Sequence, residues 1–263
     1  TFHSTCARIL RRHAELLDFN TNFAIYDTSD QLSTLKRVYR RLGLDAKVLE
    51  PRRVANAIDN AKNNYLSPDD LKREAYNVTA EQIAELYQEY EKELLPANAM
   101  DFGDLLCNVV TLFHLEPKVL AHYHDQFKFI LIDEYQDTNP VQYLLVRALS
   151  KSRKNICVVG DDDQSIYSFR GATIKNILTF QQDYPEAKII TLEQNYRSTQ
   201  NILSAASAVI SRNKERQPKQ LKTTNPQGDA IVCLSSYNEI EEAERIADEI
   251  SRLQRNGISF DNM

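Results

Sequence analysis

The chain has 263 residues, of which 42% are hydrophobic and 26% are charged, and it contains only six glycines. It is therefore long enough for one large domain or two to three small ones, and its composition excludes a collagen-like, low-complexity or membrane-spanning chain. The formal net charge of −5 argues against nucleic acid as a partner, because phosphate-binding proteins usually carry a basic excess.

The first hundred residues are predicted to be helical. Thr28–Gln31 has the pattern of a capping box, and Gly43 follows a run of apolar residues at helical spacing, so a helix is expected between them. Ser67 begins a second helix, which has a proline in its first turn. A further capping box is predicted at Thr79–Gln82, and Pro96 ends the helix that follows it.

Short apolar runs then alternate with helical patterns. The runs 127–132, 156–159 and 189–192 are expected to be buried strands, and the helical stretches 141–149 and 174–183 lie between them. This alternation indicates a parallel α/β sheet. Each run is followed by polar residues, and ligands of such sheets bind outside the carboxyl ends of the strands. We therefore expect the three strand ends to form one site.

The last part of the chain, after Ser198, is predicted to contain a helix, a strand at 231–234 and a final helix at 239–254. Asn238 is the expected cap of the final helix, and Gly257 is its expected end. The first of these helices is expected to pack through an apolar face formed by Ile202, Ala205, Ala206 and Val209.

The four cysteines, Cys6, Cys107, Cys157 and Cys233, form no Cys-x-x-Cys pair and stand among apolar residues. Their spacing suits neither a zinc site nor a disulfide framework, so buried thiols are expected. Together with the lack of a signal peptide, this favours a reducing, cytoplasmic setting.

Three groups of basic residues weaken the inference from net charge. A solvated helix face is the competing interpretation of each group. The groups are Arg8, Arg11 and Arg12; Lys36, Arg37, Arg40 and Arg41; and Arg212, Lys214, Arg216, Lys219 and Lys222.

Asp133 and Glu134 stand at the end of the first predicted strand. Nucleotide hydrolysis needs one carboxylate to hold magnesium and a second group to orient or deprotonate the attacking water. Successive side chains at a strand end point in different directions, so two adjacent acids can divide these tasks. The alternative interpretation is a helix N-terminus, where acids interact favourably with the helix dipole.

Five segments carry distinctive patterns: Thr1–Ser4, Met100–Phe102, Asp133–Asp137, Gly160–Ala172 and Leu192–Ser198. Together they resemble the motifs of superfamily 1 DNA helicases of the UvrD/PcrA/Rep type. The motifs occur in the family's order, and the resemblance spans nearly the whole chain.

The resemblance implies roles in ATP hydrolysis for five residues. Asp133 holds the magnesium of Mg-ATP, and Glu134 acts as general base on the attacking water. Gln164 contacts the γ-phosphate and reports its presence to the DNA-binding surface. Arg197 also reaches the γ-phosphate, and Tyr196 stacks on the adenine. A planar guanidinium suits a dispersed anionic phosphate, and an amide that bonds the phosphate in one state only can act as a switch.

Five further residues are implied to contact DNA. Tyr167 and Phe169 face single-stranded DNA, and Thr1, Phe2 and His3 touch its backbone. Aromatic rings stack on any base, which a motor moving along DNA requires. Core packing is the alternative interpretation of the two rings. The family usually has tryptophan at position 169, so a weaker base contact is expected there.

The implied fold class is α/β. A partial, parallel-sheet RecA-like ATP-binding domain comprises 1–22 and 95–197, an all-helical domain is inserted at 23–94, and a second, truncated RecA-like domain begins at 198–263. ATP and Mg²⁺ are the implied cofactors. The implied activity is 3′ to 5′ movement along single-stranded DNA and unwinding of partly duplex DNA, with repair or replication proteins as partners and no membrane.

Missing and altered features of the chain also shape these expectations. No Gly-x-x-x-x-Gly-Lys-Ser/Thr loop occurs to hold the phosphates, and the chain does not begin with methionine. We therefore expect a piece of a longer protein that alone neither hydrolyses ATP nor unwinds DNA. Gly103 stands where the family commonly has an acid, so Asp101 and Asp104 are expected to matter only for packing.

Other classes of protein compete with this interpretation. The motor subunit of a nuclease–helicase complex would share all of these motifs. A metal-dependent nuclease or phosphohydrolase would use Asp133, Asp161 and Asp163 without nucleotide, but it would leave Gln164 and Arg197 without a role. A binding module is chemically possible for the isolated piece.

Overall fold

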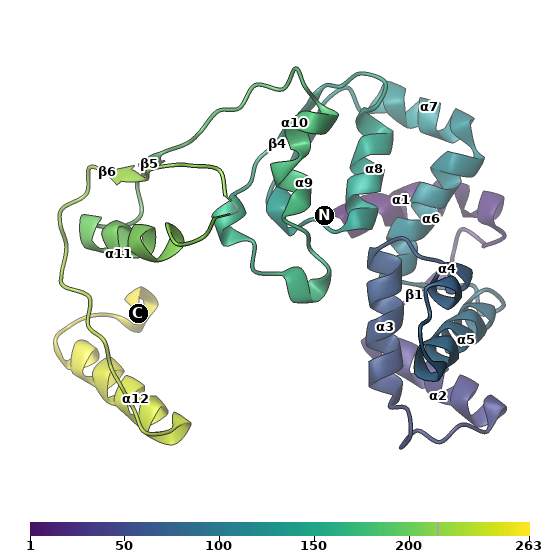
Figure 1. Cartoon of the computed structure of the whole chain (residues 1–263), viewed down its shortest axis with the longest axis horizontal. Coiled ribbons are helices and arrows are strands. Elements are labelled where there is room, and N and C mark those ends of the chain that lie inside the picture. Colours follow the sequence, from purple (N-terminus) through teal and green to yellow (C-terminus); the bar gives the residue numbers. More distant parts are fainter. Residues whose placement is uncertain (215) are drawn as a thin grey trace. The chain divides into compact units, whose positions relative to one another are not determined.

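The computed structural model describes residues 1–214 and 216–263, with the backbone alone described at position 170. The chain divides into two compact units, Thr1–Ile189 and Ile190–Met263. Helices predominate, and the short strands form parallel pairs (Figure 1). The fold is thus a helix-rich α/β structure. Within the described residues no helix combines the length and the apolar character needed to cross a membrane.

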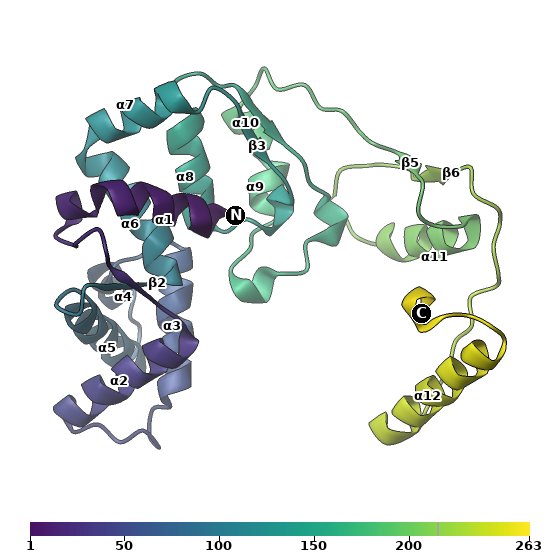
Figure 2. The same ribbon diagram turned by 180° about the vertical axis from the view of Figure 1, so that it is seen from behind.

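Four helices build the first core of unit 1. They are α1 (Phe2–His13), α6 (Phe102–Leu115), α7 (Pro117–Gln126) and α8 (Pro140–Ser150). Helix α6 lies between α1 and α8 (Figure 2). The apolar stripe of α6 supplies much of the core, because its Leu105, Val109 and Leu112 are all buried against Cys6 and Leu10 of α1.

A second core belongs to the helices between residues 28 and 94. These are α2 (Thr28–Leu42), α3 (Pro51–Asn63), α4 (Pro68–Arg73) and α5 (Val78–Leu94). Leu35, Ile58 and Tyr90 are buried at its centre. The chain enters this helical group through β1 (Ala24–Tyr26) and leaves it through β2 (Ala99–Asp101), and the two strands pair in parallel with Ala24 opposite Ala99.

Helix α2 is capped one residue earlier than predicted, by Asp27 rather than Thr28. The capping box uses Asp27, whose carboxylate accepts hydrogen bonds from Ser29 N at 2.7 Å and Asp30 N at 2.9 Å, while Asp30 accepts from Asp27 N at 3.2 Å. The carboxylate of Asp27 pairs with two backbone N–H groups of the first turn that have no partner within the helix. This explains why the predicted Thr28–Gln31 box is not used. Gly43 ends the helix in the left-handed conformation, with φ of 67°, as predicted.

The predicted cap is correct for α4 and wrong for α5. Ser67 caps α4 and a proline follows it, as predicted. Helix α5 is instead capped by Asn77, whose side-chain oxygen accepts from Ala80 N at 2.8 Å, so the predicted Thr79–Gln82 box lies inside the helix. The asparagine side chain already satisfies a first-turn amide, which leaves no need for a later cap.

The central strands form a smaller sheet than predicted. Strands β3 (Ile130–Ile132) and β4 (Ile156–Val158) pair in parallel, with Ile130 opposite Ile156, and α8 connects them. The helix predicted at 174–183 is divided into α9 (Lys175–Leu178) and α10 (Phe180–Asp183). Side chains of α9 and α10 pack with Ile132 and Tyr135 in a third, small core.

The third predicted strand, 189–192, is wrong. These residues have no regular structure, and Leu192 is 76% exposed. Strand β5 instead starts two residues later, at Gln194–Asn195, and pairs in parallel with β6 (Lys222–Thr223). An apolar run becomes a strand only where a neighbouring backbone can pair with it. In this region the pairing begins after the apolar run, where Lys222 N donates to Glu193 O at 2.8 Å.

Unit 2 contains two longer helices, α11 (Gln200–Ile210) and α12 (Glu239–Arg255). Asn238 caps α12 as predicted, and Gly257 follows it with φ of 85°. The strand predicted at 231–234 is irregular and exposed, because it pairs with no other strand among the described residues of this unit. The predicted apolar face of α11 is also wrong: Leu203 is its buried residue, whereas Ile202, Ala206 and Val209 are exposed.

The cysteine prediction holds for only part of the set. Cys6 is buried in the first core and Cys107 is half-buried, but Cys157 and Cys233 are exposed. Cys157 lies at the middle of β4, where successive side chains point to opposite faces, and its side chain is on the face that no described helix covers.

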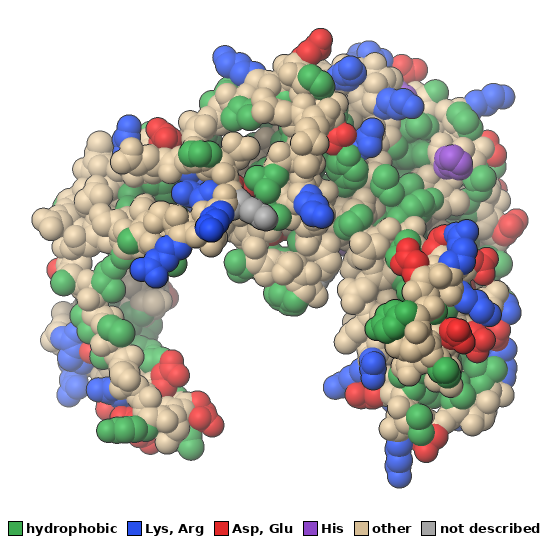
Figure 3. Space-filling model, in the orientation of Figure 1, with side chains coloured by type: hydrophobic (Ala, Val, Ile, Leu, Met, Phe, Trp, Pro, Cys, Tyr) green, Lys and Arg blue, Asp and Glu red, His purple; other side chains and the backbone are tan. Residues whose placement is uncertain are grey.

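Surface charge is mixed over the helical group. Figure 3 shows acidic and basic side chains interspersed over α4 and α5. Arg41, from the second basic group, forms ion pairs with Glu89 at 2.8 Å and Glu93 at 3.3 Å. These pairs support the interpretation of that group as a solvated helix face.

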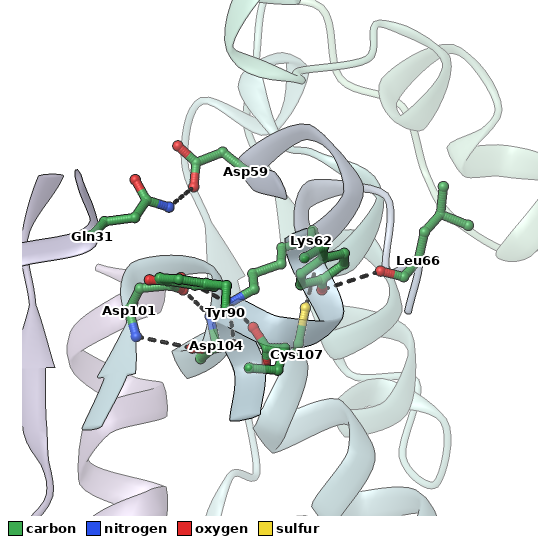
Figure 4. Close-up of polar contacts among 10 residues, drawn as sticks. Gln31, Asp59, Lys62, Leu66, Tyr90, Asp101, Asp104 and Cys107 are labelled. Carbon is green, nitrogen blue, oxygen red and sulfur yellow. Dashed lines mark hydrogen bonds and ion pairs between the residues drawn. The ribbon is translucent and has the colours of Figure 1, made fainter. Parts of the chain in front are cut away.

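A buried lysine joins the helical group to β2 and α6 (Figure 4). Lys62, at the end of α3, is 1% exposed, and its Nζ lies 2.8 Å from Asp101 Oδ2, 2.6 Å from Asp104 Oδ1 and 2.8 Å from Glu91 Oε1. Tyr90 OH also donates to Asp101 Oδ2 at 3.0 Å. The expectation that the two aspartates serve packing is therefore incomplete, because they are the counter-ions of Lys62.

Gly103 makes room for this lysine, and we expect Gly103→Ala to destabilise the chain. A Cβ at position 103 would lie 2.7 Å from Lys62 Cδ and 2.9 Å from its Cβ. Overpacking costs about 1–3 kcal/mol and outweighs the roughly 1 kcal/mol that alanine gains in a helix. Urea unfolding followed by circular dichroism measures the difference. An unchanged free energy of unfolding would show that Lys62 moves freely.

Candidate active site

The end of β3 presents two exposed carboxylates. Asp133 Oδ1 accepts a hydrogen bond from Glu134 N at 3.0 Å. Glu134 lies in the left-handed region, with φ of 52° and ψ of 44°. This conformation is unfavourable for a residue with a side chain and persists only where the surroundings enforce it. The helix-dipole interpretation does not fit, because only the short 3-10 turn Tyr135–Asp137 follows.

The side chain of Gln136 connects the ends of the two strands. It is 1% exposed, its Nε2 donates to Glu134 Oε2 at 2.8 Å, and its Oε1 accepts from Asp161 N at 3.0 Å. Backbone hydrogen bonds extend the strand pairing to this point, because Val159 N donates to Ile132 O and Tyr135 N donates to Val159 O. Gln136 belongs to the segment Asp133–Asp137, but no pattern in the sequence predicts a role for it.

Gln164 lies on the loop that follows β4. Its Nε2 donates to Asp161 Oδ2 at 2.9 Å, and Asp161 Oδ1 accepts from Asp163 N at 3.0 Å. An unbroken series of hydrogen bonds thus runs from Glu134 through Gln136 and Asp161 to Gln164. The structure brings together the predicted general base and the predicted phosphate sensor.

Asp137 is a further acid beside this network. Burial, followed by the nearby charge of Glu134, raises its pKa, although a hydrogen bond from Gln136 opposes the shift. Its Oδ1 is buried and has no hydrogen-bond partner among the described side chains and backbone. Such an atom is costly to leave unpaired, and its burial is the main reason for the raised pKa of Asp137.

Asp133 fits a magnesium ligand better than the acidic run on the β4 loop does. Its carboxylate is exposed, and its Oδ1 accepts a hydrogen bond from the next backbone N–H. An exposed carboxylate suits a hard cation held directly or through water. The carboxylates of Asp161, Asp162 and Asp163 lie within 4.8 Å of one another. Asp133 is not part of that group, so in the described residues the cluster required by the nuclease alternative does not form.

The predicted DNA-stacking rings are on the surface. Tyr167 is 37% exposed and Phe169 is 74% exposed, and their ring centroids lie 6.0 Å apart at an angle of 46°. This exposure contradicts core packing. The turn that carries them ends at Gly171, whose φ is 85° and where a Cβ would lie 3.1 Å from Asn63 Nδ2 of α3.

The first three residues form the start of α1. Thr1 caps the helix, its Oγ1 accepting from Ser4 N at 3.3 Å, and Phe2 packs against the first and third cores. The ring of His3 contacts Phe102 edge to face, with centroids 5.7 Å apart. Burial of this ring lowers the pKa of His3, so the imidazole is neutral at physiological pH.

Tyr196 and Arg197 lie in unit 2, whereas the other candidates lie in unit 1. Both side chains are exposed, Tyr196 at 81%. Asn195 at the end of β5 shapes their turn, because its Oδ1 accepts from Arg197 N at 3.0 Å and Ser198 N at 2.8 Å. Asn225 Nδ2 donates to Tyr196 O at 3.2 Å and ties the turn to the segment after β6.

Parallel strands that end in carboxylates, with a polar side chain on the next loop, are the arrangement of nucleotide-hydrolysing α/β proteins. Comparison with known families agrees. Residues 1–185 match the family model of the UvrD/REP helicase N-terminal domain, and residues 190–263 match that of the UvrD-like helicase C-terminal domain. The chain belongs to the UvrD/REP helicase family.

Individual relatives are similar over the whole chain. The ATP-dependent DNA helicase PcrA of Staphylococcus epidermidis is 48% identical over 263 residues, which cover 100% of this chain and 36% of that protein. The ATP-dependent DNA helicase PcrA of Staphylococcus aureus is 47% identical over the same share of both chains. The chain therefore spans little more than a third of the length of these relatives.

Proposed function

We propose that this chain is part of a longer ATP-dependent DNA helicase that couples Mg-ATP hydrolysis to 3′ to 5′ movement along single-stranded DNA and to unwinding of duplex DNA. The observation that carries the proposal is the hydrogen-bonded series from Glu134 to Gln164 at the ends of β3 and β4. Membership of the UvrD/REP family and 48% identity to a PcrA helicase support it. The protein acts in the cytoplasm, in repair or replication of DNA.

Each candidate residue has a task in hydrolysis. Asp133 would hold the magnesium ion, which would neutralise charge on the phosphate oxygens. Glu134 accepts a proton from the attacking water, because its carboxylate is exposed and its orientation is fixed by Gln136. Gln164 exchanges Asp161 for the γ-phosphate when ATP is present. Arg197 stabilises the departing phosphoryl charge, and Tyr196 stacks on the adenine.

The domain boundaries follow the same proposal. A RecA-like domain comprises 1–22 and 95–197, a helical domain is inserted at 23–94, and a second RecA-like domain begins at 198. The separate core of α2, α3 and α5 supports an inserted domain, and so does the pairing of β1 with β2 at its entrance and exit.

The full-length protein that contains this chain tests the proposal. We expect Mg²⁺-dependent ATP hydrolysis that single-stranded DNA stimulates, and unwinding of a duplex with a 3′ tail but not of one with a 5′ tail. The isolated 263-residue chain is expected to hydrolyse no ATP, since its sequence has no phosphate-binding loop. DNA cleavage with Mg²⁺ alone, or an ATPase rate indifferent to DNA, would overturn the proposal.

The exposed rings make a separate prediction about DNA binding. Replacing both Tyr167 and Phe169 with alanine is expected to weaken binding of single-stranded DNA, because each base–ring stack contributes about 1–3 kcal/mol. Fluorescence anisotropy with a labelled oligonucleotide measures the Kd. Tyr237→Ala is the matched control, since Tyr237 is 98% exposed and lies outside the proposed DNA surface. Equal affinity of the double variant and the control would remove these rings from the DNA site.

A further inference from the structure

Gln136 uses both ends of its side-chain amide to connect two loops of unit 1. The Nε2 donates to Glu134 Oε2 on the loop after β3, and the Oε1 accepts from Asp161 N on the loop after β4. The side chain is almost completely buried. A buried amide with both ends paired has a single orientation, because exchange of its nitrogen and oxygen would place donor against donor and acceptor against acceptor.

Gly160 allows the loop after β4 to lie close to the side chain of Gln136. Gly160 precedes Asp161, and a Cβ at position 160 would lie 2.6 Å from Gln136 Oε1, 2.9 Å from Ile177 Cδ1 and 3.2 Å from Tyr135 N. A side chain at 160 would therefore displace the amide. The loop after β4 can approach this closely only because that residue is glycine.

Both partners of Gln136 are groups whose position matters for hydrolysis. Glu134 is held in a left-handed conformation, and its carboxylate accepts from Gln136 rather than turning freely into solvent. Asp161 in turn accepts from Gln164 Nε2 at 2.9 Å. One side chain thus lies between the group proposed to activate water and the group proposed to contact the γ-phosphate.

We infer that Gln136 is a positioning residue that orients the carboxylate of Glu134 and couples it to Gln164 through Asp161. This inference rests on the proposed function and deepens it. Movement of the Gln164 loop when γ-phosphate binds or leaves is transmitted through Asp161 N and the Gln136 amide to Glu134.

Steady-state ATP hydrolysis by the full-length protein, at saturating single-stranded DNA, tests the inference. Gln136→Met keeps similar volume and removes both hydrogen bonds, whereas Gln136→Glu keeps the acceptor for Asp161 N but directs a carboxylate at Glu134. We expect kcat to fall on the order of 10- to 100-fold in both variants, since small errors in position have effects of this size. The KM for ATP should change by less than about threefold, because neither variant removes a group proposed to touch ATP. Gln182→Met, at an exposed position on α10, is the control and should behave as the unmodified protein.

A double-mutant cycle distinguishes coupling from general damage. If Gln136 acts through Gln164, then Gln136→Met combined with Gln164→Ala should lose little more activity than the more damaging of the two single variants. Independent, multiplying losses would overturn the coupling. A kcat within twofold of the unmodified protein in either folded Gln136 variant would overturn the positioning role, as would a change confined to KM.

Two measurements keep these outcomes separate from other failures. Circular dichroism and the melting temperature show whether each variant is folded, and Gln136→Glu decides the matter if Gln136→Met does not fold. The unmodified protein must first show DNA-stimulated ATP hydrolysis. If it shows none, the proposed helicase function fails, whereas a normal unmodified protein with fully active Gln136 variants refutes this inference alone.

Discussion

Replacing Glu134 with glutamine in the full-length protein is expected to reduce the kcat of DNA-stimulated ATP hydrolysis by about 10²- to 10⁴-fold. Glutamine is nearly the same size and can still bond Gln136, but it cannot accept the proton of the attacking water. The KM for ATP should change little, because Glu134 is exposed at the end of β3 and is proposed to contact water rather than nucleotide. Initial rates at varied ATP concentration give both constants.

The control for this variant is Glu186→Gln. Glu186 is exposed on the segment after α10 and takes no part in the network at the strand ends, so the same loss of charge should leave kcat unchanged. Binding of a fluorescent ATP analogue should be equal in the two variants. Substantial ATP turnover by the Glu134 variant would mean that another group accepts the proton, and Asp137, with its raised pKa, would be the first candidate.

Local features of the structure could largely be predicted from the sequence. The stop of α2 at Gly43, the cap of α4 at Ser67 and the cap of α12 at Asn238 depend on residues within one helical turn, so their patterns are visible in the chain itself. The errors at Asp27 and Asn77 have a local cause too. Several side chains near each start can cap a helix, and the one actually used depends on where the preceding chain arrives.

Features that depend on distant partners could not be predicted. The run 189–192 is mostly apolar, yet it forms no strand, because strand formation requires a neighbouring backbone that composition does not reveal. The role of Gln136 depends on Gly160 and Asp161, which α8 and β4 bring to it. Lys62 has the appearance of an ordinary helix lysine in the sequence, and its counter-ion Asp104 is 42 residues away.

The candidate site contains both features that are local in sequence and features that depend on distant partners. The carboxylates of Asp133 and Glu134 could be placed at a strand end, because an apolar run directly precedes them. Gln164 could be assigned to the next strand end for the same reason. The hydrogen bonds that connect these two ends could not be foreseen, since they require a register that only the folded β3–β4 pair defines.

The second large effect is expected from Lys62→Met, which should lower the free energy of unfolding of the chain by about 3–5 kcal/mol at neutral pH. Burial alone would lower the pKa of Lys62, but Asp101, Asp104 and Glu91 raise it well above its usual range, so the ammonium is charged in the folded state. Methionine fills similar space and removes that charge. The buried Asp101 and Asp104 then lose their counter-ion and repel one another.

The pH dependence of this loss has a definite sign. In the unmodified chain, burial opposes ionisation of Asp101, but Lys62 lowers its pKa, whereas burial and the charge of Asp101 raise the pKa of Asp104. Without Lys62, the charge that lowers the pKa of these acids is lost, although Tyr90 OH and Asp104 N still donate to Asp101. We expect the pKa of both acids to rise and to lie above the unfolded value of about 3.9. A group with a raised carboxyl pKa binds more protons when folded, so its folded state gains stability as pH falls toward the unfolded pKa.

Urea unfolding at pH 5 and pH 8 therefore tests the assignment of Lys62 as the counter-ion of these acids. The deficit of Lys62→Met relative to the unmodified chain should be smaller at pH 5 than at pH 8, because protonation of one acid relieves the repulsion. Lys72→Met is the matched control: the side chain of Lys72 is 56% exposed and lies 3.7 Å from Glu85, so its loss should cost less than about 1 kcal/mol at either pH. A deficit that is independent of pH would contradict this assignment and would attribute the effect of Lys62 to packing of its hydrocarbon stem. That stem is tightly enclosed, because a Cβ at position 103 would lie 2.7 Å from Lys62 Cδ.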